Sequence, residues 1–209
     1  EMVKMEQAEK TDLLARMKEL ANAQHAELVN IRRHLHENPE LGFEEVATAQ
    51  YIADYLAGLG LEVTSQVAKT GVVALLRGAR PGKTVAIRAD MDALPIQELN
   101  EVPYKSKHPG KMHACGHDAH VAAAIGAARI LWELRDQING NVKFIFQPAE
   151  EAPGGAEPMI AAGVLENPAV DAIIGGHGWG SVESGIIEVM SGPTMASSDI
   201  IRMKIIGKG

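Results

Sequence analysis

Short apolar runs rich in β-branched residues alternate with longer segments of helical periodicity along this chain. Apolar side chains recur at helical spacing in three segments, and a shorter helix is expected near residue 159; these predicted helices are 10–37, 43–59, 117–134 and 156–162. The predicted strands are 61–67, 72–77, 84–88, 140–147 and 170–179. The alternation predicts an α/β fold with a mixed, mostly parallel sheet and helices on both faces.

The end of the chain differs from the rest. Residues 184–209 contain two further strand-like runs and no helical pattern. Gly192-Pro193 is the best candidate for a boundary, because Gly and Pro together interrupt regular structure. We therefore predict one domain over residues 1–193 and the start of a second over residues 194–209.

Composition and charge exclude several classes of protein. Of the 209 residues, 46% are hydrophobic and 22% are charged, as in ordinary globular domains. The net charge is -7 and no long basic run occurs, so nucleic acid is not an expected partner. No stretch of about 18 apolar residues predicts a membrane span. The polar first residues lack a signal-peptide pattern, which predicts a cytoplasmic protein, with secretion as the alternative.

Acidic and imidazole side chains follow three of the predicted strands. Asp90 and Asp92 come after one strand and Glu150 and Glu151 after another, while His177 lies near the end of a third. In open α/β sheets, sites form in the crevice beyond the carboxyl ends of the strands. We therefore expect these distant residues to converge.

The stretch "MHACGHDAH" adds a thiol and an imidazole at the start of a helix. Cys115, the only cysteine, cannot form an internal disulfide, and in an extended loop its side chain would lie on the same side as that of His117. The helix N-terminus is expected to lower the pKa of Cys115. Thiolate, imidazole and carboxylate together favour Zn, Mn, Co or Ni over Ca or Mg.

The two adjacent glutamates are expected to have different roles. In extended chain, Glu150 and Glu151 would point to opposite sides, so one could bind a metal while the other moves protons. This combination is typical of metal-assisted hydrolysis.

Each of these residues also has an ordinary structural interpretation. A buried cysteine can be a small hydrophobic residue, and acidic residues after strands are common in turns. His34 and His36 are expected to pack or to cap the end of the first helix. His113 and His120 could equally pack or orient the site. The shared position at strand ends is what favours a metal site.

Taken together, "RRHLHENPELGFEE", "IRADMDALPIQE", "MHACGHDAHVAAAIGAARIL", "FIFQPAEEAPGGAEPMI" and "GGHGW" resemble the M20 metallopeptidase family over about residues 28–209. The similarity is greatest to its amidohydrolase branch, which includes N-acyl-amino-acid amidohydrolases, hippurate hydrolase and auxin-conjugate hydrolases. The resemblance implies a zinc-exopeptidase-like catalytic domain and an inserted α+β lid that forms homodimers, with "SSDIIRMKIIGKG" as the first lid strand.

The resemblance also implies roles for individual residues. Two divalent metal ions would be bound in a complete site, with Glu150 as the general base. The implied metal ligands are Cys115, His117, Glu151 and His177. The residues expected to orient these ligands are Asp90, Asp92, His113 and Asp118. Arg88 stands where many relatives outside this branch have a metal-binding histidine.

The implied reaction is hydrolysis of the amide bond of an N-acyl amino acid. Family members are longer than this chain, and a ligand histidine near their C-terminus has no counterpart here. We therefore expect weak second-metal binding and little or no activity of the chain alone. Two alternatives stay open, namely a noncatalytic remnant with a partial metal site and a hydrolase with Cys115 as nucleophile. The metal, the acyl group and the amino acid are not specified by the sequence.

Overall fold

A computed structural model describes residues 2–196 and 201–208 of the chain. The chain divides into two units, Glu1–Gly178 and Trp179–Gly209. Within the described residues, every helix and strand lies in the first unit. None of the helices there has an apolar stretch long enough to span a bilayer.

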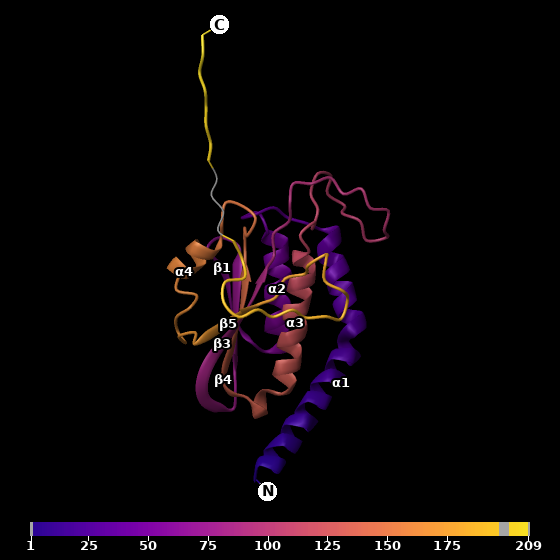
Figure 1. Ribbon diagram of the computed structural model, residues 1–209, viewed down its shortest axis with the longest axis vertical. Coiled ribbons are helices and arrows are strands. Elements are labelled where there is room, and N and C mark those ends of the chain that lie inside the picture. Colours follow the sequence, from indigo (N-terminus) through magenta and orange to yellow (C-terminus); the bar gives the residue numbers. More distant parts are fainter. Residues whose placement is uncertain (1, 197–200, 209) are drawn as a thin grey trace. The chain divides into compact units, whose positions relative to one another are not determined.

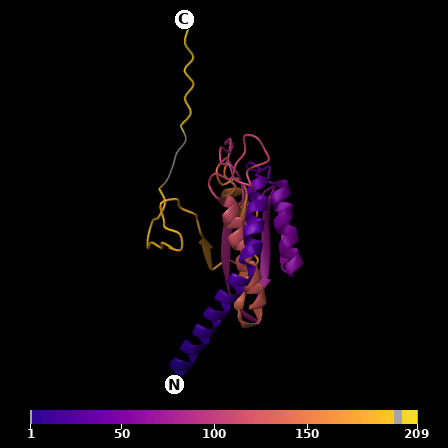
Figure 2. The same ribbon diagram turned by 90° about the vertical axis from the view of Figure 1, so that its right-hand side faces the viewer.

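The predicted helices form, with shifted boundaries. The helices are α1 (Met2–Glu37), α2 (Val46–Leu59), α3 (His117–Glu133) and α4 (Ala156–Ala161), with a 3₁₀ turn at Arg135–Gln137. α1 begins earlier than predicted, and the part before its contact with α3 extends beyond the sheet (Figure 2). α2 begins later, because residues 41–44 form a turn in which Phe43 has φ +61°, a conformation outside the helical range.

The five strands form one mixed sheet. They are β1 (Glu62–Val67), β2 (Gly71–Arg77), β3 (Arg80–Asp90), β4 (Asn139–Gln147) and β5 (Ala172–Gly175), in the order β1-β2-β4-β3-β5. β3 is parallel to both β4 and β5, whereas β2 is antiparallel to both β1 and β4. The predicted mixed sheet is confirmed, but two of its four strand pairings are parallel and two are antiparallel, so the sheet is not mostly parallel by pairing. The turn between β1 and β2 is too short for the crossover that a parallel pair needs.

Helices cover the two faces of the sheet unequally. α1, α2 and α3 pack on one face over a core that includes Ile52, Ile125 and Phe144, all fully buried (Figure 1). On the other face, a smaller cluster forms around Met159 of α4 and Ile145 of β4. The prediction of helices on both faces is therefore confirmed, although a single short helix covers the second face.

Two predictions near the end of the chain were wrong. β5 was expected to be a buried strand, but all four of its residues are exposed, because it is an edge strand paired only with β3. In the second unit, the described residues contain turns and bends but no strand. The predicted lid strand falls partly on residues 197–200 and 209, which lie outside the described residues.

The parallel strands bring the candidate site residues together at the carboxyl ends of β3, β4 and β5. In the sheet register, Asp90 of β3 lies opposite Gln147 of β4, and Arg88 lies opposite Gly175 of β5. β3, β4 and β5 therefore end side by side. The segments that carry Asp92, Glu150 and His177 all leave the sheet at this edge.

Candidate metal centre

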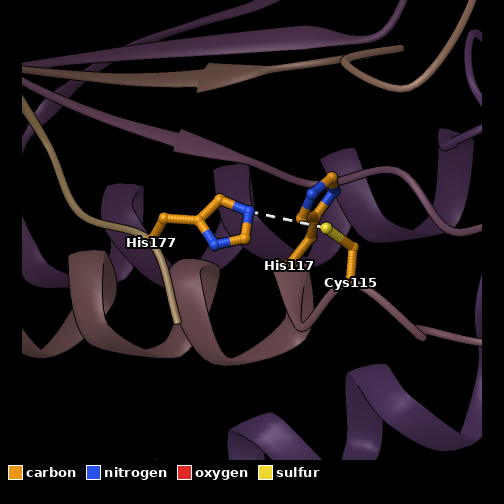
Figure 3. A group of neighbouring side chains, drawn as sticks. All are labelled: Cys115, His117 and His177. Carbon is orange, nitrogen blue, oxygen red and sulfur yellow. Dashed lines mark hydrogen bonds between the residues drawn. The ribbon is translucent and has the colours of Figure 1, made fainter. Parts of the chain in front are cut away.

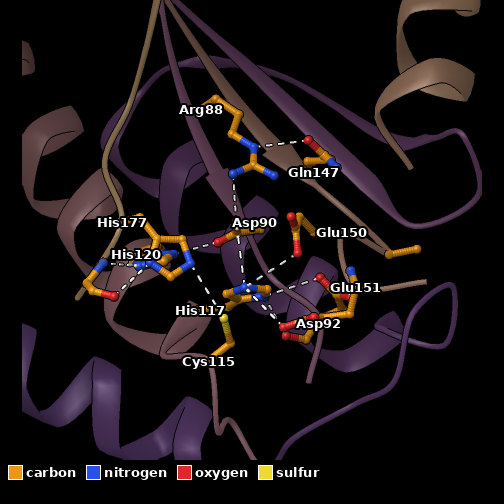
Figure 4. A network of polar contacts seen from close by, with 12 residues as sticks. Arg88, Asp90, Asp92, Cys115, His117, His120, Gln147, Glu150, Glu151 and His177 are labelled. Carbon is orange, nitrogen blue, oxygen red and sulfur yellow. Dashed lines mark hydrogen bonds and ion pairs between the residues drawn. The ribbon is translucent and has the colours of Figure 1, made fainter. Parts of the chain in front are cut away.

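His117, the first residue of α3, is fully buried at the centre of the site (Figure 4). Its Nδ1 atom lies 2.8 Å from the backbone oxygen of Asp92, so Nδ1 donates a proton and Nε2 carries the lone pair. Within the described part of the chain, Nε2 is buried with no hydrogen-bond partner. Because buried polar atoms are nearly always paired, this nitrogen requires an explanation.

Three groups of metal-binding residue types include His117. These groups are Cys115/His117/His177, His117/Glu150/Glu151 and Asp90/His117/His120, and within each group the ligand atoms lie within 4.8 Å of one another. The four residues predicted as ligands thus come together around His117. The carboxylates of Glu151 and Glu150 lie 3.8 Å and 4.0 Å from its Nε2 atom.

His177 faces the same centre from the end of β5. Its Nδ1 donates to the backbone oxygen of Gly178 over 2.7 Å, which leaves the lone pair on Nε2. That atom lies 3.5 Å from the sulfur of Cys115 (Figure 3). Both histidines are therefore oriented by backbone carbonyls, as metal-binding histidines commonly are.

A turn, not an extended loop, brings Cys115 and His117 together. Gly116 between them has φ +90° and forms the N-cap of α3. A side chain is disfavoured in this left-handed conformation, so glycine suits the position. The expectation of an extended loop was wrong.

The two glutamates also lie in a turn. Ala149 before them has φ +49°, and both Glu150 and Glu151 direct their carboxylates towards His117. The expectation that they point to opposite sides was wrong, because it assumed extended chain. The backbone N–H of Glu151 donates to Oδ2 of Asp92 over 3.0 Å, which connects this turn to the end of β3.

Asp90 organises the side of the site nearest to β5. It accepts hydrogen bonds of 2.6 Å from His120 and from Arg88, and Arg88 also donates to Gln147. Burial alone would raise the pKa of Asp90, but the hydrogen bond from His120 and the charges of His117 and Arg88 lower it to about 2. The other ring nitrogen of His120 accepts from the N–H of Gly178. His120, which the sequence left undecided, thus connects β3 to the His177 segment.

The carboxylates give the site an excess of negative charge. Burial and the nearby Glu151, Glu150 and Asp90 raise the pKa of the Cys115 thiol to about 12. The predicted lowering was wrong, because these groups outweigh the helix N-terminus. Burial lowers the pKa of His117, but the hydrogen bond to Asp92 and the surrounding carboxylates raise it overall. The site therefore favours a positive charge at its centre.

The chain is similar to known proteins. Residues 86–203, which are more than half of the chain, match the sequence model of peptidase family M20/M25/M40.

The chain belongs to this family.

Its relatives within the M20 family include enzymes of the amidohydrolase branch. The chain is 50% identical over 194 residues to an N-acyl-L-amino acid amidohydrolase of Geobacillus stearothermophilus, covering 92% of this chain and 52% of that protein. It is 48% identical to IAA-amino acid hydrolase ILR1-like 4 of Arabidopsis thaliana, covering 87% and 41%. The chain thus spans about half the length of the relatives it matches.

The fold also matches a solved M20 structure. The YXEP protein of Bacillus subtilis, described as a dinuclear metal-binding peptidase, superposes with a TM-score of 0.73 at 48% identity. The match covers 77% of this chain and 44% of that one.

A second buried network of this M20 chain lies beside the site. Asp118, which is predicted to orient the ligands, contacts Arg32 and His36 of α1 at 2.8 Å and 2.7 Å. The other ring nitrogen of His36 lies 3.2 Å from Glu98 in the loop before α3. His113 is also buried nearby, and burial lowers its pKa to about 4. His36 packs as expected, but its two carboxylate partners were not visible in the sequence.

Replacing His36 with glutamine is expected to destabilise the chain in a pH-dependent way. The hydrogen bond to Asp118 raises the pKa of His36 despite burial, and Glu98 adds to the effect. Because the pKa is higher in the folded chain, the stabilisation is complete below the unfolded value of about 6.5 and is lost as pH rises through the folded value. We expect a loss of about 1.5–3 kcal/mol in the free energy of unfolding near pH 6.

Urea unfolding at a series of pH values measures this effect. The deficit of His36→Gln relative to the unchanged chain should shrink as pH rises above about 6.5 and through the raised pKa of His36 in the folded chain. The exposed His25 provides the control, because His25→Gln should show no such trend. A deficit that is constant across the series would contradict the charged state of His36.

Proposed function

We propose that the site is the metal centre of an amidohydrolase that cleaves N-acyl amino acids. The observation that carries the proposal is the buried, unpartnered Nε2 atom of His117, which faces a thiol and two carboxylates within the described site. The amidohydrolases among the M20 relatives support the substrate class.

The residues present suit a divalent transition metal. Cys115, His117, Glu151 and His177 are the proposed ligands, and thiolate, imidazole and carboxylate donors fit Zn, Mn, Co or Ni. A cation there would neutralise the charge that raises the thiol pKa of Cys115. When bound, one or two such ions would polarise the amide carbonyl and acidify a water. Asp92 and Gly178 hold His117 and His177 in the tautomers that this requires.

Glu150 is the proposed general base. Its side chain is 40% exposed, compared with 27% for Glu151, so it reaches further towards the open side from which a substrate would arrive. Glu150 would take the proton from the attacking water and deliver it to the departing amide nitrogen. Glu151 lies closer to His117 and is connected through its backbone to Asp92, which suits the fixed role of a ligand.

A cysteine nucleophile remains the competing mechanism, since Cys115 and His177 are in contact. A thiol with a pKa of about 12 is a poor source of thiolate near neutral pH. The two mechanisms also respond differently to reagents. EDTA should abolish hydrolysis by a metal centre and leave hydrolysis by a cysteine nucleophile intact.

Metal analysis beside an activity screen tests the proposal. We expect the purified chain to take up Co²⁺ with a thiolate-to-metal charge-transfer absorption that EDTA removes and Cys115→Ser lacks. Hydrolysis of N-acyl amino acids, measured with the chain in excess over substrate, should be weak and should require the metal. A correctly folded chain that takes up no Co²⁺, Zn²⁺ or Mn²⁺ would overturn the proposal.

A further inference from the structure

Glu45 is a fully buried glutamate outside the candidate metal centre. It occupies the N-cap position of α2, yet its carboxylate makes no capping hydrogen bond. Glu40 caps this helix instead, accepting from the N–H groups of Ala47 and Thr48 at 3.1 Å and 2.7 Å. The carboxylate of Glu45 is therefore free to bind elsewhere. Burying a carboxylate is costly unless its oxygens are hydrogen-bonded.

Both oxygens of Glu45 have partners, from two different loops. Oε2 accepts from the hydroxyl of Thr70 over 2.6 Å, in the turn before β2. Oε1 accepts from the backbone N–H of Ala149 over 2.8 Å, in the turn after β4. Burial raises the pKa of Glu45, and these hydrogen bonds oppose the rise.

Ala149 immediately precedes the two glutamates of the candidate metal centre. It is fully buried and has φ +49°, a left-handed conformation that is disfavoured for any residue with a Cβ atom. Its N–H is held by Glu45, and its carbonyl accepts from the N–H groups of Gly154 and Gly155 at 3.1 Å and 2.9 Å. The next residue in the chain is Glu150.

The loop between α1 and α2 packs closely against the same turn. A Cβ atom built on Gly42 would lie 2.6 Å from the carbonyl of Ala152 and 3.0 Å from Cα of Ala149. A Cβ atom on Gly155 would lie 1.9 Å from the carbonyl of Pro148. The turn therefore packs closely against glycine backbones on one side and the Glu45 carboxylate on the other.

We propose that Glu45 is a positioning residue that fixes the left-handed turn at Ala149 and thereby aims Glu150 and Glu151 at His117. The inference rests on the proposed metal-dependent function, since those two glutamates are its base and one of its ligands. Without the acceptor at Glu45, the N–H of Ala149 would be buried and unpaired. The turn could then relax towards φ below zero, which would redirect both carboxylates.

Three variants separate positioning from stability. Glu45→Met removes the acceptor at similar size. Glu45→Gln keeps an oxygen for Ala149 and can donate its amide to the Thr70 hydroxyl. Thr70→Val breaks the other hydrogen bond of Glu45 and leaves the Ala149 bond in place, so it is the matched control for lost stability.

Calorimetric titration with Co²⁺ is the first measurement. Glu45→Met should weaken binding by about 10–100-fold, as loss of groups that support metal ligands typically does. The Co²⁺ affinity of Glu45→Gln and of Thr70→Val should stay within about threefold of that of the unchanged chain, which is well below the change expected for Glu45→Met. Equal binding by Glu45→Met, or equal weakening by Thr70→Val, would overturn the inference.

Amide hydrogen exchange tests the inference without any metal. In Glu45→Met, the N–H groups of Ala149, Glu151, Gly154 and Gly155 should exchange faster, while those in the centre of β4 should not change. Faster exchange spread over the whole sheet, or none in the turn, would overturn the inference. The unchanged chain could take up no Co²⁺ while the turn still exchanges faster in Glu45→Met. In that case the proposed function is wrong, but the inference that Glu45 holds the turn stands.

Discussion

Replacing His117 with alanine is expected to abolish tight metal binding. His117 is the one residue shared by all three groups of metal-binding residue types in the described chain. Its Nε2 atom is buried without a hydrogen-bond partner among the described residues, and it lies close to Cys115, Glu150 and Glu151. Loss of a ligand should exceed the effect of losing its supporting groups, so we expect a fall of at least about 100-fold in affinity.

Titration with Co²⁺, followed by thiolate-to-metal charge-transfer absorption, measures this change. His120→Ala is the matched control, because His120 occupies the same helix and contacts Asp90 with one nitrogen and Gly178 with the other. It should weaken binding by at most about 10-fold, the lower end of the range for orienting groups. Circular dichroism of both metal-free variants checks that they fold. If His117→Ala binds Co²⁺ with undiminished affinity, the proposal of a metal centre at His117 is wrong.

The convergence of the candidate residues could be predicted from the sequence. Asp90, Glu150 and His177 each follow an apolar β-branched run, and parallel strands place such positions at one edge of a sheet. This prediction needed only the type and order of the elements. It did not need the register, which the structure supplies through the pairing of Asp90 with Gln147.

The directions of side chains could not be predicted in the same way. The two wrong expectations about side-chain direction assumed extended chain where the structure has a residue with positive φ, at Gly116 and at Ala149. Glycine signals such a turn in sequence, but alanine does not, because its left-handed conformation is stabilised by distant groups such as Glu45. The prediction of a lowered pKa for Cys115 was wrong for a similar reason, because the neighbouring carboxylates come from segments that follow other strands.

The partners of several buried polar residues could not be predicted either, although these residues lie within the motifs themselves. Glu45, Glu98 and His36 lie in stretches whose pattern fits a solvated helix end or loop. Their partners are up to 104 residues away in sequence, as for Glu45 and Ala149. A periodicity argument reports only which face of an element is apolar, so it says nothing of such pairs.

Replacing Glu150 with glutamine is expected to remove most hydrolytic activity and to leave the metal in place. Glutamine keeps the size of the side chain but cannot accept a proton from water, and general-base catalysis typically contributes about 10²–10⁴-fold to a rate. Metal affinity should change little, because Glu150 is the more exposed of the two glutamates and the more distant from Nε2 of His117.

Glu151→Gln is the matched control for this substitution, one residue along the same turn. It should lose metal affinity, since Glu151 is the proposed ligand, and its activity should recover in part at high metal concentration. The activity of Glu150→Gln should not recover under those conditions, because its metal site is already filled. Hydrolysis of an N-acyl amino acid, measured with the chain in excess and across a metal titration, separates the two patterns. If the patterns are exchanged, with Glu150→Gln rescued by metal and Glu151→Gln not, the two glutamates have the opposite roles.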